Sequence, residues 1–457
     1  MTNNHFSISL KVFCALCLLL SLCSCTKNDN TEEALLPVPV VVGDVQQGEK
    51  DWWPQFRGPN SSGIGQGRPP IHFGPNKNAQ WKTDVKSGIS SPVVWEDRIF
   101  LTEFDRKDQQ LATLCIDRRT GKILWRQAVK TKEIEKVHAI SSPAGSTPVT
   151  DGERVYVYFG SYGLVCYDLD GNLKWEIRMP IPENPYGAVS SPIIAGNLLV
   201  LNHQGQNSYL LAVNPKNGRT VWKTDRSLFR YGWSTPVFWR HDGIEEILVL
   251  GGDFQPNQRL MAYNLSDGKE RWWVGGLPPC GKSTPVIGDG ILFFAAPDII
   301  LEPAAEKSDP EAAGRFYANN SACIMAVRPG SAGALNRTDV VWSERKGVPG
   351  VASPLYYNGC LYSFKNDGIV FCRDAKTGNL IYSGRTGAFG YYYSSPVAAD
   401  NRIYIASAEG SVVVLDTGRQ LKILATNDLE SSILATPAIV DGNLYVRTES
   451  HLYSFGN

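Results

Sequence analysis

Hydrophobic and polar residues alternate in short runs along most of the chain, and Gly, Pro or Asx turns bound these runs. Runs such as RVYVYF (154–159), CLYSF (360–364) and RIYIAS (402–407) have the period of two that is typical of β-strands. Residues with strong β preference dominate them. The pattern predicts an all-β protein built from many short strands.

A second pattern repeats on a longer scale. A small residue, then Ser or Thr, then Pro precedes a hydrophobic run at eight places, 41 to 69 residues apart by subtraction. The Ser or Thr positions of these eight anchors are Ser91, Thr147, Ser191, Thr235, Thr284, Ser353, Ser395 and Thr436. Most units offer four strands, which at this period is typical of a propeller blade. We therefore predict an eight-bladed β-propeller of four-stranded antiparallel blades.

The anchors and the ends of the units fit this fold. Small residues suit innermost strands that crowd around the axis, and proline is tolerated where a strand edge faces the channel. The last unit has three strands, and AQWKTDVK (79–86) matches the fourth-strand pattern ILWRQAVK (123–130), so we expect this N-terminal strand to close the ring. Several fourth strands carry a tryptophan that we expect to pack on the next blade: Trp125, Trp175, Trp222, Trp272 and Trp342.

The first 25 residues resemble the export signal of a bacterial lipoprotein. An apolar run too short to span a membrane ends at Leu22 and Ser24, which precede Cys25 as in a lipobox. We expect cleavage before Cys25 and lipidation of its thiol, which would anchor the chain in the cell envelope, at the periplasmic or surface face of the outer membrane. An ordinary secretory peptide cut elsewhere is the alternative.

The chain thus divides into a signal peptide, a flexible tether, a capping segment and the propeller, at residues 1–24, 25–50, 51–78 and 79–457. The segment DWWPQFRGPNSSGIG (51–65) carries aromatic residues and Arg57, which a solvated tether would leave without contacts. We expect it to dock on the propeller as a cap or plug. Arg57 either packs there or holds a ligand.

Composition excludes several classes of function. Forty-five basic and 45 acidic residues leave no net charge, so there is no basic stripe for nucleic acid. Cys115, Cys166 and Cys372 share a repeat position with alanines of other blades, which indicates small buried strand residues. No His or Cys pair has the spacing of a metal site, so we expect no metal. The remaining cysteines of the propeller, among which a disulfide stays open, are Cys280, Cys323 and Cys360.

The units resemble the repeat of the pyrroloquinoline-quinone-like (PQQ-like) propeller family. The closure D-x-x-T-G-x-x-x-W is present as DRRTGKILW (117–125), with looser copies at 214–222, 264–272 and 374–382. The resemblance covers residues 79–457. It implies one of two functions. Some members are quinoprotein dehydrogenases, and another is the lipoprotein subunit of the outer-membrane β-barrel assembly machinery, which binds a protein partner.

This chain departs from the dehydrogenase branch. It has no adjacent cysteine pair, no C-x-x-C-H haem site and no Trp-Asp pair. We therefore expect a binding or scaffold module without a cofactor, most similar to the assembly subunit. A PQQ- and calcium-dependent alcohol or sugar dehydrogenase is the alternative.

Loops that lead into the innermost strands, and loops between second and third strands, should share one face of the ring. They are rich in aromatic and amide side chains, which suit a protein or carbohydrate partner. We expect the protein to be a monomer that binds its partner at this face. The sequence identifies no catalytic residue. The candidate binding residues are Tyr186, His203, Tyr231, Trp233, Asp253, Lys282, Lys365, Tyr391, Tyr392 and Tyr393.

Overall fold

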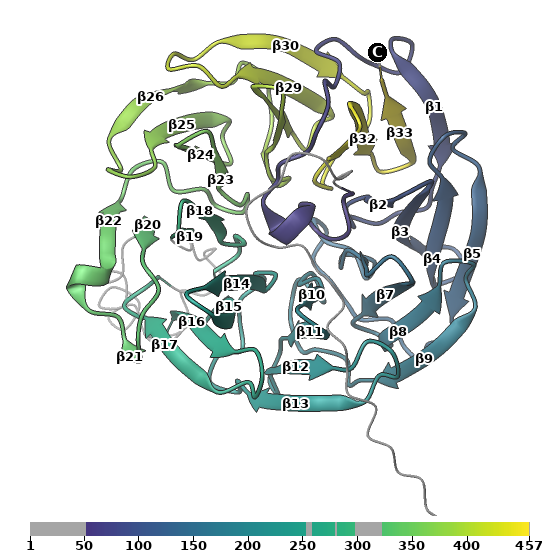
Figure 1. Cartoon of the computed structure of the whole chain (residues 1–457). Helices are drawn as coiled ribbons and strands as arrows, with labels where there is room; N and C mark the ends of the chain where they lie inside the picture. Colours follow the sequence, from purple (N-terminus) through teal and green to yellow (C-terminus); the bar gives the residue numbers. More distant parts are fainter. Residues whose placement is uncertain (1–51, 253–257, 279–280, 298–321, 457) are drawn as a thin grey trace, which may run out of the picture. The chain divides into compact units, whose positions relative to one another are not determined.

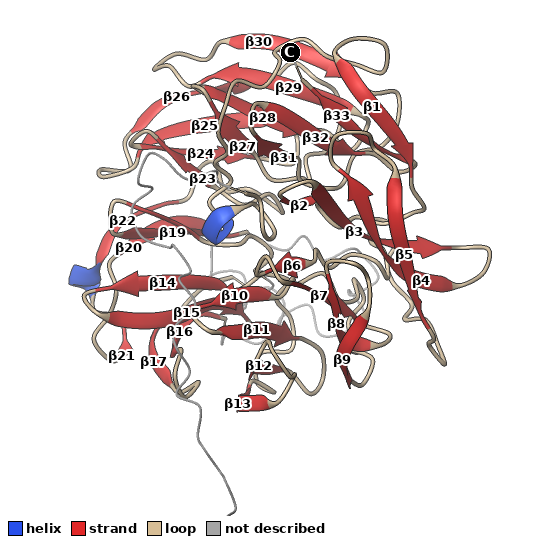
Figure 2. Ribbon diagram, turned by 45° about the vertical axis from the view of Figure 1, so that its right-hand side comes forward, coloured by secondary structure: helices blue, strands red, loops and turns tan. Residues whose placement is uncertain are grey.

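The fold was determined as a computed structural model, which describes residues 52–252, 258–278, 281–297 and 322–456. These residues form eight antiparallel blades around a central axis (Figure 1), as the repeat predicts. Figure 2 shows that the blades are almost entirely strand. The described helices are the short 3-10 turns η1 (Pro59–Ser61) and η3 (Arg337–Asp339). Within the described part, no helix is long and apolar enough to cross a membrane.

Blades 1 to 4 follow each other in chain order, innermost strand first. Blade 1 consists of β2 (Val93–Trp95), β3 (Arg98–Asp105), β4 (Gln110–Asp117) and β5 (Ile123–Val129). Blade 2 consists of β6 (Val149–Thr150), β7 (Arg154–Phe159), β8 (Gly163–Asp168) and β9 (Leu173–Arg178). Blade 3 consists of β10 (Ile193–Ala195), β11 (Leu198–His203), β12 (Tyr209–Val213) and β13 (Thr220–Asp225). Blade 4 consists of β14 (Val237–His241), β15 (Ile244–Gly251), β16 (Arg259–Asn264), β17 (Glu270–Val274) and an added parallel strand, β21 (Gly333–Ala334).

Blades 5 to 8 complete the ring. Blade 5 consists of β18 (Val286–Gly288), β19 (Ile291–Ala296), β20 (Cys323–Val327) and β22 (Val340–Glu344). Blade 6 consists of β23 (Leu355–Tyr357), β24 (Cys360–Phe364), β25 (Ile369–Asp374) and β26 (Leu380–Arg385). Blade 7 consists of β27 (Val397–Ala399), β28 (Arg402–Ala406), β29 (Ser411–Asp416) and β30 (Ile423–Asp428). Blade 8 consists of β31 (Ala438–Val440), β32 (Asn443–Arg447), β33 (His451–Phe455) and the N-terminal strand β1 (Ala79–Asp84).

The ring closes through β1, as the sequence predicts. This strand pairs antiparallel with β33, from Ala79 opposite Phe455 to Asp84 opposite His451. In Figure 1 the purple β1 lies beside the yellow β33, so two segments far apart in the sequence share one blade. The pairing covers an edge of β33 that would otherwise be open to solvent.

A continuous ring of hydrogen bonds joins the eight anchors at the axis. The backbone N–H of Ser91 donates to the Thr147 hydroxyl at 3.0 Å, and the N–H of Thr147 donates to the Ser191 hydroxyl at 2.9 Å. The same bond repeats around the axis until the N–H of Thr436 donates back to the Ser91 hydroxyl at 3.1 Å. Each anchor therefore needs Ser or Thr as an acceptor, and size alone does not explain the choice. We call these eight residues the hydroxyl ring.

A second contact joins the blades at their outer edge. The indole N–H of Trp125 donates to the Leu169 carbonyl of blade 2 at 2.9 Å, and the ring covers Gly171. A side chain at Gly171 would meet the indole, because its Cβ would lie 2.8 Å from the ring. The same pair of contacts recurs for Trp81, Trp175, Trp222 and Trp342. This confirms the predicted packing of the tryptophans and explains the Gly of the closure motif.

Trp272 is the exception, because its indole N–H donates within its own blade. The acceptor is the buried carboxylate of Glu246, at 3.1 Å. Glu246 also accepts a hydrogen bond from Arg271 and contacts His241. Opposite these outer tryptophans lie the small residues of the third strands, with Cys115 facing Trp125 and Cys166 facing Trp175. Both thiols are free and buried, as their shared repeat position indicates.

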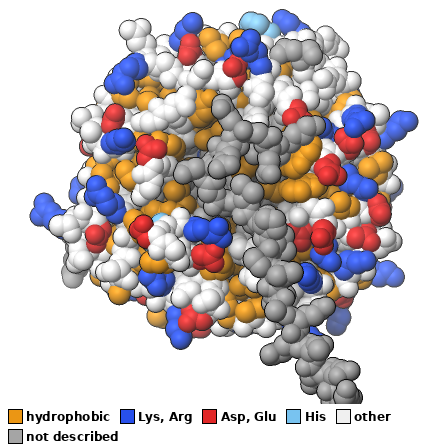
Figure 3. Space-filling model, in the orientation of Figure 1, with side chains coloured by type: hydrophobic (Ala, Val, Ile, Leu, Met, Phe, Trp, Pro, Cys, Tyr) orange, Lys and Arg blue, Asp and Glu red, His pale blue; other side chains and the backbone are white. Residues whose placement is uncertain are grey.

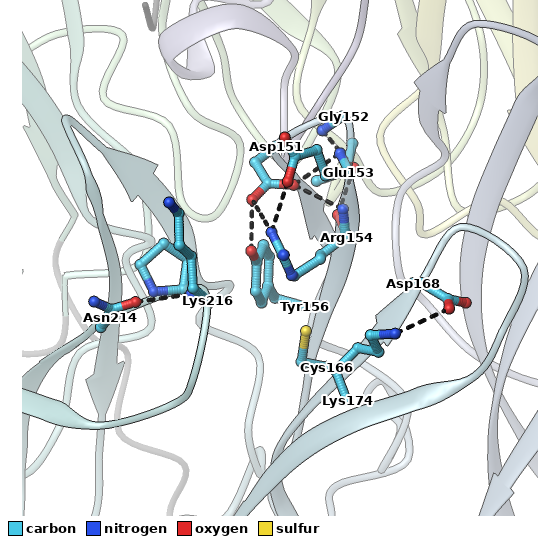
Figure 4. Close-up of polar contacts among 12 residues, drawn as sticks. Asp151, Gly152, Glu153, Arg154, Tyr156, Cys166, Asp168, Lys174, Asn214 and Lys216 are labelled. Carbon is cyan, nitrogen blue, oxygen red and sulfur yellow. Dashed lines mark hydrogen bonds and ion pairs between the residues drawn. The ribbon is translucent and has the colours of Figure 1, made fainter. Parts of the chain in front are cut away.

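Polar turns hold the hairpins between the first and second strands. In blade 2, one carboxylate oxygen of Asp151 accepts the N–H groups of Glu153 and Arg154 at 3.0 and 2.7 Å. The other oxygen accepts the hydroxyl of Tyr156 at 2.6 Å (Figure 4). Gly152 has a φ of 90°, and a side chain there would collide with Trp95 of blade 1. The Asp-Gly pair therefore fixes both the hairpin and its approach to the neighbouring blade.

Residues 52–74 lie across one end of the channel, with η1 near the axis (Figure 1). Trp53 forms an antiparallel bridge with Val94 of blade 1, and Gly63 and Gly65 pair with Ala398 of blade 7. Val94 and Ala398 come shortly after the anchors, on the innermost strands of their blades. The segment therefore covers the end of the channel where these strands finish. The loops that lead into the anchors lie at the opposite end. We call residues 52–74 the cap. The predicted signal peptide, Cys25 and the tether lie outside the described residues.

Candidate functional site

A cavity lies on the axis and is bounded by the hydroxyl ring. Its volume is about 340 Å³, and all eight ring residues line it. Phe56 of the cap closes one end. The other end is formed by the loops that lead into the innermost strands, which supply Ile140, Trp233 and Lys282 among others. We call these the mouth loops. Cavities of this size hold small molecules or short chain segments.

Aromatic side chains are fixed in position at the mouth. The rings of Tyr186 and Trp233 meet edge to face, with centroids 5.1 Å apart. The Asn184 side-chain oxygen accepts the Trp233 indole N–H at 2.9 Å and the Tyr186 backbone N–H at 3.0 Å. Ser141 donates to the Tyr186 carbonyl at 2.7 Å. Hydrogen bonds between blades 2, 3 and 4 therefore hold two rings that the sequence predicts as binding residues.

Lys282 and a tyrosine pair also lie at the mouth. Lys282 lines the cavity, with its nitrogen 5.9 Å from the Trp233 ring centre. Tyr393 lines the cavity on the other side and stacks on Tyr391, with ring centroids 6.0 Å apart. Tyr231 lies next to Trp233, with centroids 6.3 Å apart. Together with Tyr186, six predicted residues are thus brought together around one opening.

Three other predicted residues lie elsewhere. His203 is buried between blades 2 and 3, where it stacks on Tyr209 and its Nδ1 lies 2.8 Å from the Tyr158 hydroxyl. Burial lowers the pKa of His203 to about 4, with help from the charge of Lys223. We conclude that His203 is a neutral core residue at physiological pH, away from the cavity.

Tyr392 and Lys365 also fall outside the cavity. Tyr392 is fully buried in the core of blades 6 and 7, and its hydroxyl lies 2.7 Å from the Thr386 hydroxyl. Lys365 is half exposed and pairs with Asp367 at 3.5 Å. Asp253 lies outside the described residues.

Sequence reasoning missed one ionisable group behind the mouth. Glu135 belongs to the mouth loop before blade 2 and is only 6% exposed. Its carboxylate packs against Gly160 and Gly187, the residue after Tyr186. Desolvation raises the pKa of Glu135 to about 8, although the backbone of Ala188 partly offsets this rise. In the sequence Glu135 lies within the charged run KTKEIEK (130–136), which looks like an exposed loop.

The lining does not suit the calcium ion of a quinoprotein. Calcium prefers six to eight oxygen ligands, usually with carboxylates among them. The described residues of the lining include no Asp or Glu. Across the described part of the chain, no three His, Cys, Asp or Glu side chains gather as metal ligands would. The described lining therefore lacks the carboxylate ligands that the calcium ion of a quinone centre would need.

The outer surface carries mixed charge. On the face drawn in Figure 3, basic and acidic side chains are interspersed around the rim, with hydrophobic atoms between them. Surface salt bridges such as Arg68–Asp400 and Arg119–Asp97 pair some of the charges of the described residues. Such a surface differs from the single-sign patches that bind nucleic acid.

Fold and cavity together define an eight-bladed propeller of the PQQ-like class with an axial cavity. The family model of outer membrane protein assembly factor BamB matches residues 73–232 and 206–455. The chain therefore belongs to this family.

Individual relatives are distant. BamB of Taylorella asinigenitalis is 21% identical over 183 residues, which cover 35% of this chain and 47% of that protein. The alignment thus spans about half of the curated relative. The crystal structure of BamB from Moraxella catarrhalis aligns with a TM-score of 0.56 at 13% identity, over 83% of this chain and 99% of that one.

Quinohemoprotein alcohol dehydrogenase ADHIIG from Pseudomonas putida HK5 aligns with a TM-score of 0.60 at 11% identity, over 89% of this chain and 80% of that one. At such identities the structural likeness shows the shared propeller fold. It does not choose between a scaffold and a dehydrogenase. That choice depends on the residues of the site.

Proposed function

We propose that this chain is a cell-envelope scaffold that binds a protein partner through the mouth loops, in the manner of an outer-membrane assembly factor. Membership of the BamB family supports an envelope role. The lining of the cavity supports binding over catalysis, because its described residues include no carboxylate or histidine that could serve as general base.

The distribution of exposed hydrophobic residues carries the proposal. Six of the ten large exposed ones among the described residues lie at the start of outer strands, distributed over five blades. The other four all lie in mouth loops: Ile140, Leu228, Phe389 and Tyr391. Phe389 is 86% exposed, so its ring contributes little to the fold. Exposed aromatic and aliphatic residues gathered on one face are typical of a protein-binding surface. Aliphatic Leu228 and Ile140 favour a protein partner over a carbohydrate.

The proposal is tested by capture of partners from envelope extracts with the tagged protein. We expect the double variant Phe389→Ala/Tyr391→Ala to lose most of the captured partner, because exposed aromatic anchors contribute much of an interface's affinity. The matched control is Leu173→Ala/Leu380→Ala, which removes similarly exposed side chains from outer strands. Equal capture by the two double variants would refute a partner site at the mouth loops.

The lipid anchor is a further part of the proposal. Leu22 and Ser24 before Cys25 support acylation of that cysteine after export. We expect Cys25→Ala to move the protein from the membrane fraction to the soluble fraction, or to leave it unprocessed. Normal processing with unchanged membrane association would contradict the anchor.

A further inference from the structure

The lining of the axial cavity is arranged in two tiers. The residue two positions before each member of the hydroxyl ring also lines the cavity, in all eight blades. The residue between them is buried against the blades, and the Ser190 hydroxyl, for example, donates to the Ser234 carbonyl at 3.1 Å. Alternate residues of an extended chain point to opposite sides, so both tiers face the axis. We call the eight residues of the second tier the collar.

The collar is mostly apolar. It lies on the mouth side of the hydroxyl ring, because its residues precede the anchors in the chain. Two of its members are Gly145 and Lys282. The other six are aliphatic or aromatic and half-buried: Ile89, Val189, Trp233, Val351, Tyr393 and Leu434. A group that enters from the mouth therefore passes a hydrophobic tier before it reaches a polar one.

The hydroxyl ring beyond the collar retains hydrogen-bonding capacity. Each hydroxyl oxygen accepts a backbone N–H from the neighbouring blade and keeps its own proton to donate. Within the described residues, none of the eight hydroxyls donates to another protein group. Phe56 closes the cavity at the cap, whereas Arg57 is fully buried and does not line it. The cavity is thus a blind pocket with apolar walls and a hydroxyl-lined inner end.

The pocket is continuous with the exposed hydrophobic residues of the mouth loops. Ile140 is exposed and also lines the cavity. Tyr391 is exposed and stacks on Tyr393 of the collar. A protein that covers the mouth loops can therefore place one side chain in the pocket.

The two tiers restrict the chemistry of that side chain. Two residues of extended chain advance by about 6.6 Å, so only a long group touches both tiers. A sugar would bury several of its hydroxyls against Ile89, Val189 and Val351, which is unfavourable without hydrogen-bond partners. A phenylalanine side chain would leave the hydroxyl ring without a partner. A phenol satisfies both tiers, because its ring is apolar and its hydroxyl both donates and accepts hydrogen bonds.

We propose that the axial cavity receives a tyrosine side chain of the protein partner. The aromatic ring lies in the collar beside Trp233 and Tyr393, and the phenolic hydroxyl bonds to the hydroxyl ring. Tyrosines that fill a pocket near the centre of an interface contribute much of its affinity. This inference rests on the proposed function for the origin of the tyrosine, and on the two tiers for the choice of a phenol.

Three small probes test the pocket by calorimetry on the purified protein with its cap. They are N-acetyl-tyrosine amide, N-acetyl-phenylalanine amide and methyl glucoside. We expect the tyrosine probe to bind about fivefold tighter than the phenylalanine probe, which is the effect of one added hydrogen bond. The glucoside should not compete with the tyrosine probe. Equal binding of the two amides, tighter binding of the glucoside, or no binding of the tyrosine probe at millimolar concentration overturns the proposal.

Substitutions in the collar test the place of binding. Val351→Phe fills the pocket from its wall and should weaken binding of the tyrosine probe at least tenfold. The matched control, Val221→Phe, makes the same change at an exposed position of an outer strand and should have no effect. Leu434→Phe keeps the test decisive if Val351→Phe does not fold. Binding as tight in the collar variants as in the control overturns the assignment to this cavity.

The pocket and the proposed function can fail separately. If Phe389→Ala/Tyr391→Ala abolishes partner capture while the two amides bind alike, the scaffold function stands and the tyrosine pocket falls. If the tyrosine probe is preferred while this double variant captures as much partner as Leu173→Ala/Leu380→Ala, the phenol-binding pocket stands and the partner site at the mouth loops falls.

Discussion

The two ends of the central channel differ in how far their hydrophobic residues are exposed. At the capped end, backbone groups of the cap pair with the innermost strands, and the Trp53 side chain is completely buried. At the mouth, hydrogen bonds also hold the loops, but hydrophobic residues such as Phe389 remain exposed. The contrast indicates a division of roles, in which the cap stabilises the ring and the mouth contacts other molecules.

The largest effect is expected from truncation at the capped end. Trp53→Ala removes a fully buried indole that packs on Gly58, and such truncations lower the free energy of unfolding by about 3–5 kcal/mol. At the mouth, Phe389→Ala should change it by less than about 0.5 kcal/mol, because the ring is exposed. Denaturant unfolding of both variants provides the measurement. Similar losses at the two ends would show that they do not differ in their contribution to stability.

The second prediction concerns pH at the mouth. The folded-state pKa of Glu135 is raised by burial to about 8, above the ordinary carboxyl pKa of 4.5. A raised carboxyl pKa means that the folded state binds more protons, so this group favours folding below pH 4.5. That contribution is lost as pH rises from about 4.5 through 8. Glu135→Gln keeps the shape without the charge. It should therefore stabilise the protein at pH 8–9, on the order of 3 kcal/mol relative to wild type.

The control for this prediction is Glu133→Gln, which neutralises an exposed residue of the same loop. Its stability should follow wild type across the pH range. Unfolding of the three proteins at pH 5, 7 and 9 gives the comparison. If the stability of Glu135→Gln follows that of wild type at every pH, the Glu135 carboxylate is solvated and its charge does not affect stability at the mouth.

The blades could be predicted because their information is local and repeated. The alternating runs, the Asx-Gly turns and the eight anchors all repeat once per blade and indicate the same four-stranded unit. The segment AQWKTDVK (79–86) resembles the fourth strands closely enough to predict that β1 lies beside β33. The closure motif also located the outer tryptophans. What it did not reveal is that the glycine of one blade lies under the tryptophan of another.

The site was predicted less fully, because loops have no periodic pattern. The run Tyr391-Tyr392-Tyr393 shows the difficulty: the first side chain is exposed, the second is buried in the core, and the third lines the cavity. Nothing in the triplet itself separates the three. Glu135 was missed and His203 was assigned to the binding face for a similar reason, since burial depends on contacts with other blades.

One signal was present and could have been used. The first anchor position accepts alanine, at Ala352 and Ala435, whereas the second is Ser or Thr in all eight blades. Smallness explains the first position. Only a need for the hydroxyl explains the second, and this need became clear from the ring of hydrogen bonds.

The hydroxyl ring gives the smallest expected effect and the last prediction. Thr235→Val preserves shape but removes the acceptor of the Ser191 backbone N–H, which is buried at the axis. Leaving a buried donor unpaired costs about 1–3 kcal/mol, so the variant should unfold at a lower denaturant concentration. Thr235→Ser keeps the acceptor and should lose less, since it removes one methyl group. A Val variant as stable as the Ser variant would show that the anchor position requires only a side chain of this shape. The difference in the free energy of unfolding between the two variants separates the contribution of the hydroxyl from that of the space it fills.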